Sequence, residues 1–129
     1  MNPDDPLSWI IKGNRDLALV KDMLPNWVKF PDLLCYHCQQ SAEKHLKALL
    51  LYHGQPLKRT HDLEELVDLL APFEPSITAE HYNNALIIND YAILMRYPGL
   101  SIDPTETDVL EALASAEFFR NFAARILGI

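Results

Sequence analysis

Cysteine is scarce in this sequence, with Cys35 and Cys38 the two examples among 129 residues. In a helix they would lie about one turn apart, a spacing that rarely allows good disulfide geometry. We therefore expect reduced, buried thiols, because free cysteine is among the most buried residue types. Structural zinc needs four ligands, usually in separated pairs, and nearby His37 falls on another helix face. The sequence therefore predicts no metal and no other cofactor.

Long hydrophobic runs are also missing. The longest, Ala48–Tyr52, is far shorter than the roughly 18–20 residues that a membrane-spanning helix needs. The first six residues are acidic and contain two prolines, unlike the basic and then apolar segments of a signal peptide. These absences predict a cytoplasmic protein without membrane contact.

Basic residues are rare in the second half of the chain. Residues 60–119 hold twelve acidic residues and a single basic one, Arg96, whereas residues 1–59 hold eight basic and six acidic residues. The net charge of the chain is −7, whereas general nucleic-acid binders are positively charged at the surface that contacts phosphate. We therefore expect no DNA binding and only local contacts with RNA or a nucleotide.

Alternating strand patterns are absent, whereas apolar residues recur at the three–four spacing of helices. Proline and glycine divide the chain into five predicted helices. These cover residues 8–24, 32–53, 61–71, a span from Ser76 or Thr78 to just before Pro98, and 104–127. The pattern predicts one all-α domain over residues 1–129, an up-and-down antiparallel bundle of four long helices and one short helix, with residues 1–7 flexible.

The ends of two helices carry recognisable signals. Ser8 is the expected N-cap of the first helix. In the last helix, we expect Asp103 to be the N-cap, Pro104 to take the first helical position and Glu106 to complete a capping box. Gly128 is expected to end this helix.

Two helices have more apolar surface than one core face requires. The second helix is apolar on several sides, which indicates a central position or a shared surface. In the last helix, Phe118 and Phe122 project away from the main core face, and exposed phenylalanines favour an interface. We expect a homodimer. Its candidate interface residues are Phe118, Phe122, His37, Ser41 and Ala48.

Candidate ligand contacts centre on the fourth predicted helix. Asp90 faces its apolar side and needs a partner there. Arg96 and Tyr97 stand at its end, where an arginine either complements the helix C-terminus or contacts phosphate beside a base-stacking tyrosine. Lys44 and His61 complete the predicted nucleotide- or phosphate-binding set. His61 has an alternative role, fixing the loop before the third helix.

The segment Cys38–Leu50 resembles the Q-Q-x-x-E-K-x-L-K-A pattern of the HEPN family. Further pieces follow in the family's order over about residues 8–127: Gly54, Thr60–Leu63, Asp90–Tyr91 and Arg96–Pro98. This resemblance implies a helical bundle, a homodimer, and pairing with a minimal nucleotidyltransferase, often in a prokaryotic toxin–antitoxin pair.

Many HEPN proteins are ribonucleases that use an Arg followed, after four to six residues, by a His. No histidine follows Arg96 here, so we predict no catalytic residue. The leading hypothesis is a non-catalytic module that binds a nucleotidyltransferase, a nucleotide, or both. One alternative is a divergent ribonuclease using Arg96 with His61 or His37 from another helix. Another is a purely structural protein-interaction bundle.

Overall fold

The described chain consists of helices and loops. The computed structural model describes residues 1–89, 91 and 103–129. Its elements are α1 Pro6–Met23, the 3-10 helix η1 Leu24–Lys29, α2 Pro31–Tyr52, α3 Leu63–Leu70, α4 Ala79–Asn89 and α6 Glu106–Leu127. The all-helical class predicted from the sequence is confirmed.

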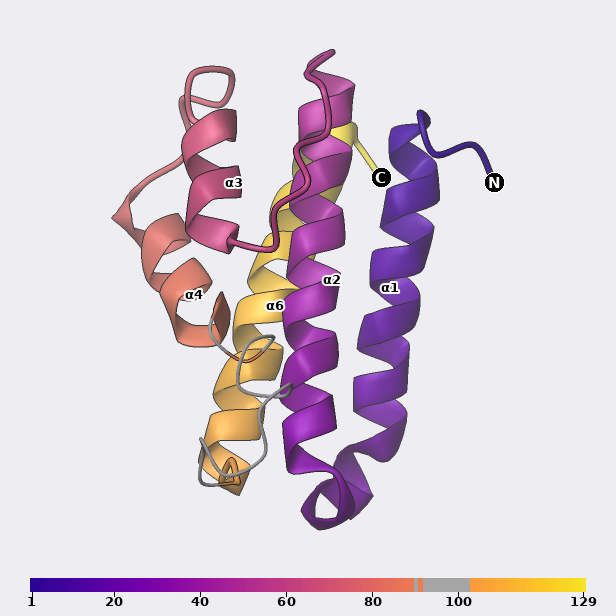
Figure 1. Ribbon diagram of the computed structural model, residues 1–129, viewed down its shortest axis with the longest axis vertical. Helices are drawn as coiled ribbons and strands as arrows, with labels where there is room; N and C mark the ends of the chain where they lie inside the picture. The colour runs from indigo at the N-terminus through magenta and orange to yellow at the C-terminus, as the bar shows by residue number, and fades with distance from the viewer. Residues whose placement is uncertain (90, 92–102) are drawn as a thin grey trace.

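The three longest helices, α1, α2 and α6, lie side by side along the long axis (Figure 1). Helices α1 and α2 run in opposite directions, and α3 and α4 form a shorter antiparallel pair beside them. The connection after α2 returns along the bundle before α3 begins, so α6 runs in the same direction as α2.

Helix α2 is the centre of the fold, as its apolar pattern predicted. It packs against α1, α3, α4, α6 and η1. Its buried residues include both free thiols, Cys35 and Cys38, and the imidazole of His45. Burial raises the pKa of Cys35 to about 12, so this thiol is protonated at neutral pH. None of the described helices has the length and apolar character needed to cross a membrane.

The helix caps differ from those predicted. Asp5 rather than Ser8 caps α1, and its Oδ1 accepts from the Leu7 N–H at 2.9 Å, which places Pro6 in the favoured first position. Thr105 caps α6 and forms a reciprocal capping box with Asp108. The assignment of Asp103, Pro104 and Glu106 to these roles was therefore wrong. The predicted end is confirmed, since Gly128 has a left-handed φ of 72°.

The expectation that Phe118 and Phe122 form an exposed surface is also wrong. Phe122 is 1% exposed, and Phe118 is half-buried against the core. The His81 ring of α4 packs edge-on against both, with centroids 4.9 Å and 4.5 Å away. A helical wheel of α6 alone does not reveal that α4 covers this second face. The homodimer remains a prediction.

Candidate functional site on the α1–α2 face

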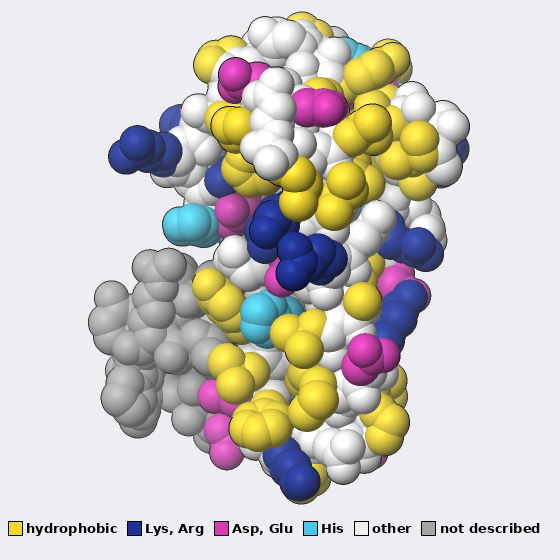
Figure 2. Space-filling view, turned by 90° about the vertical axis from the view of Figure 1, so that its right-hand side faces the viewer, with side chains coloured by type: hydrophobic (Ala, Val, Ile, Leu, Met, Phe, Trp, Pro, Cys, Tyr) yellow, Lys and Arg dark blue, Asp and Glu magenta, His cyan; other side chains and the backbone are white. Residues whose placement is uncertain are grey.

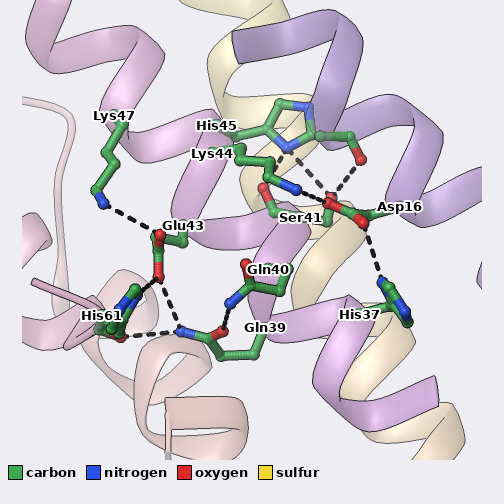
Figure 3. A network of polar contacts seen from close by, with 11 residues as sticks. Asp16, His37, Gln39, Gln40, Ser41, Glu43, Lys44, His45, Lys47 and His61 are labelled. Atoms are coloured by element: carbon green, nitrogen blue, oxygen red, sulfur yellow. Dashed lines mark hydrogen bonds and ion pairs between the residues drawn. The ribbon is translucent and has the colours of Figure 1, made fainter. Parts of the chain in front are cut away.

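Three of the predicted ligand contacts, Asp90, Arg96 and Tyr97, lie outside the described residues. The other two, Lys44 and His61, are described and belong to separate polar clusters on α2 (Figure 3). The Asp16 cluster consists of Asp16, His37 and Lys44, and the Glu43 cluster consists of Gln39, Glu43, Lys47 and His61.

Asp16 joins α1 to α2 through two side chains. Its Oδ2 lies 2.5 Å from Lys44 Nζ, and its Oδ1 lies 3.0 Å from His37 Nδ1. The Asp16 side chain is 12% exposed, so its charge requires a partner inside the protein. Lys44 supplies that partner, and its own charge is thereby largely neutralised. The carboxylate also orients the His37 ring, because Nδ1–H must donate to it.

One turn earlier on α1, the backbone of Gly13 meets α2 directly. Ser41 Oγ donates to the Gly13 carbonyl at 2.9 Å. A Cβ on Gly13 would lie 2.7 Å from His45 Cε1 and 2.9 Å from its Nδ1. Real Cβ atoms do not approach ring atoms so closely, so the contact between the two helices requires glycine here.

Burial holds His45 in one protonation state. Burial, opposed by its hydrogen bond to the Ser41 carbonyl, lowers the pKa of His45 to about 4, so the ring is neutral at pH 7. Nδ1 lies 2.8 Å from the Ser41 carbonyl oxygen and therefore carries the proton. Nε2 faces the Asn14 side chain and lies 3.1 Å from its Oδ1. The His45 side chain is completely buried.

Two of the predicted interface residues on α2, His37 and Ser41, contact α1, and Ala48 is buried. Ser41 and Ala48 are fully buried within the single chain, and His37 is bonded to Asp16. The expectation that Ser41 and Ala48 lie on an interface surface is therefore wrong. Helix α1 covers that side of α2, which a wheel of α2 by itself cannot show.

The Glu43 cluster fixes the loop that precedes α3. Glu43 Oε1 accepts from His61 Nδ1 at 2.8 Å, and Oε2 pairs with Lys47 Nζ at 3.1 Å. Gln39 Nε2 donates to the His61 backbone carbonyl at 2.9 Å. The Glu43 side chain is 5% exposed, so these bonds offset the desolvation of its charge. The loop-fixing role of His61 therefore holds, although its side chain is 58% exposed and remains open to a ligand.

Two hollows flank the Asp16 cluster. The first, about 200 Å³, is lined by residues that include Trp9, Lys12 and Lys44. The second, about 220 Å³, is lined by Leu19, Met23, Phe30, Leu33, Leu34 and His37. Figure 2 shows basic and histidine side chains midway along the α1 side of the molecule, with hydrophobic side chains above and below them. This face therefore combines cationic groups with apolar surface.

Sequence reasoning missed Gly13 and Asp16 as the residues that join α1 to α2. One face of α1 is formed by Gly13, Leu17 and Val20, which follow helical spacing. The charged residue Asp16 lies beside this apolar face, and this was the signal in the sequence. The described residues contain no group of three or more potential metal ligands.

Replacing Gly13 with alanine tests the close contact. We expect Gly13→Ala to lower the free energy of unfolding by about 1–3 kcal/mol, because the new Cβ overlaps the His45 ring. In a His45→Ala background the same change should be neutral or stabilising, since alanine favours helix by about 1 kcal/mol over glycine. Urea unfolding of the four proteins measures both effects. Equal destabilisation in the two backgrounds would disprove the contact.

Comparison with known proteins places this arrangement in a family. The HEPN domain model matches residues 7–127. An archaeal HEPN homologue of known structure, ST0689, is 26% identical, with a TM-score of 0.73 and coverage of 95% of this chain and 96% of its own. TT1696 from Thermus thermophilus is 24% identical, with a TM-score of 0.77 and coverage of 93% and 96%. The comparison with curated proteins gives no match. Because the family match spans nearly its whole length, this chain belongs to the HEPN domain family.

Proposed function

We propose that this HEPN protein is a non-catalytic, homodimeric binding module that acts in complex with a minimal nucleotidyltransferase. The class of partner comes from the family resemblance. The observation that supports docking is an apolar patch where α1, η1 and α2 meet. We define this apolar patch as Leu19, Met23, Phe30 and Leu33.

The apolar patch is continuous, because its four residues line one hollow of about 220 Å³. Leu19, Phe30 and Leu33 are 43%, 42% and 40% exposed. Single exposed apolar residues are common on soluble proteins, but contiguous apolar surface is typical of interaction sites. The patch therefore offers the apolar centre that a protein interface needs.

Charge indicates what would cover the patch. The apolar patch lies in the part of the chain where basic residues exceed acidic ones, whereas residues 60–119 are strongly acidic. A partner surface that is apolar at its centre and acidic at its rim would complement the patch. We assign the patch to the nucleotidyltransferase, and a second copy of this chain is the competing occupant.

A nucleotide or RNA phosphate is a second element of the proposal. Arg96 and Tyr97 remain its main candidates from sequence. The hollow beside Trp9 adds Lys12 and Lys44, which combine an aromatic surface with two cations. Lys44 already pairs with Asp16, so Lys12 is the stronger phosphate contact of the two.

A ribonuclease is the second candidate function, and one contact favours it. The Asp16 carboxylate orients His37, as acidic residues orient catalytic histidines in many enzymes. The His37 side chain is 29% exposed, so it remains accessible to a substrate. In this reading His37 transfers the proton and Arg96 stabilises the phosphate.

Partner docking is tested with Leu33→Glu, which places a charge in the apolar patch. The tagged protein is purified from its native lysate, and any nucleotidyltransferase recovered is identified, purified and titrated calorimetrically. We expect Leu33→Glu to weaken its binding by at least about tenfold, because burying the carboxylate is unfavourable. Leu86→Glu on α4, where Leu86 is 61% exposed, is the matched control and should bind normally.

The same proteins distinguish the two possible occupants. Light scattering should show the same oligomeric state for Leu33→Glu and the unaltered protein. Conversion of a dimer to a monomer would assign the apolar patch to self-association. Recovery of no nucleotidyltransferase, or normal binding by Leu33→Glu, would reject the docking proposal.

The absence of independent ribonuclease activity is tested with the purified protein and total RNA in the presence of a chelator. We expect no cleavage, because no histidine follows Arg96 at the spacing that the ribonucleases use. Cleavage that is lost in both His37→Gln and Arg96→Ala would instead establish the enzyme. His53→Gln serves as the control, since His53 pairs with Glu74 at the other end of α2.

A further inference from the structure

A second polar site lies where α1, α2 and α6 meet near the end of the chain. Figure 1 shows the carboxyl end of α6 at the same end of the bundle as the amino end of α1. A pocket of about 240 Å³ opens there. It is lined by Ile10, Asn14, His45, Arg120, Ala124 and Ile129. Neither the Asp16 cluster nor the apolar patch contributes to it.

The Arg120 guanidinium lacks a counter-ion in this pocket. Its Nε is buried and has no hydrogen-bond partner in the described part of the chain. Glu117, one turn earlier on α6, pairs instead with Lys21 at 2.7 Å. Asp16 on α1 is occupied by Lys44 and His37. Among the described residues, these two acids are therefore engaged elsewhere, and the half-buried Arg120 side chain, with its buried Nε unpartnered, lines the cavity.

The side chains of His45 and Asn14 in the pocket are uncharged and cannot neutralise Arg120. The neutral His45 ring donates through Nδ1 to the Ser41 carbonyl, and its Nε2 lies 3.1 Å from Asn14 Oδ1. A water molecule could accept from Nε–H, but it would leave the charge uncompensated. The pocket also exceeds the roughly 10–15 Å³ that one water requires.

We infer that this pocket binds a small organic monocarboxylate, with its oxygens on Arg120 and its carbon chain against Ile10, Ala124 and Ile129. A guanidinium matches a carboxylate through two parallel hydrogen bonds. Phosphate has the same oxyanion chemistry but carries about two negative charges at neutral pH. A single guanidinium would leave part of that charge unpaired, so the carboxylate is favoured. This site is independent of the proposed function.

The test is a titration of the isotopically labelled full chain with isobutyrate, acetate and inorganic phosphate, followed by amide NMR shifts. Isobutyrate should give saturable shifts at residues 10–14, 45 and 120–129, and it should bind more tightly than acetate. Arg120→Gln should weaken isobutyrate binding by at least about tenfold, because a charge-assisted hydrogen bond is lost. Arg125→Gln removes the same charge from an exposed position of α6 and should bind normally.

A second variant keeps the proposal testable if Arg120→Gln folds poorly. Asn14→Asp places a carboxylate in the pocket as an internal partner for Arg120, so it should abolish isobutyrate binding without lowering the melting temperature. Absence of saturable binding by the unaltered protein would overturn the carboxylate site. Undiminished binding by Arg120→Gln or Asn14→Asp would do the same. Tighter binding of phosphate than of isobutyrate would overturn the choice of ligand.

Discussion

The close approach of α1 to α2 at Gly13 is the contact on which the rest of this bundle depends. Because Gly13 has no Cβ, the His45 ring lies directly against the α1 backbone, and Ser41 bonds the Gly13 carbonyl. This spacing brings Asp16, one turn further along α1, to Lys44 and His37. One small residue thereby allows the close packing that sets two long helices against each other.

The residues that carry the family resemblance are largely used to hold the fold. Gln39, Glu43 and Lys47 anchor the loop before α3, and Lys44 neutralises a buried carboxylate. These charges are compensated internally, so they are poor sources of affinity for a ligand. Among the described residues, the surfaces that remain for binding include the apolar patch on the α1–α2 hairpin and the hollows near Trp9 and Arg120.

The sequence was sufficient to predict the described α-helices, the central place of α2 and the burial of Cys35 and Cys38, because these follow from local periodicity. It was insufficient wherever two elements cover the same residue. Phe122 belongs to a core face because His81 of α4 packs on it, and Ser41 is buried because α1 lies above it. The pocket at Arg120 combines three helices distant in sequence. Such convergence depends on packing, which periodicity within one helix does not encode.

We conclude that the polar residues of the α1–α2 contact stabilise the fold. A double-mutant cycle on Asp16 and Lys44, using Asp16→Asn, Lys44→Met and the double variant in urea unfolding, tests it most directly. We expect the single changes to destabilise the protein and the two residues to be coupled by about 1–3 kcal/mol, because Lys44→Met leaves a largely buried carboxylate without its cation. Coupling near zero, with the free energy of unfolding unchanged by either single substitution, would show that the pair does not stabilise the fold and would leave both residues available for a ligand.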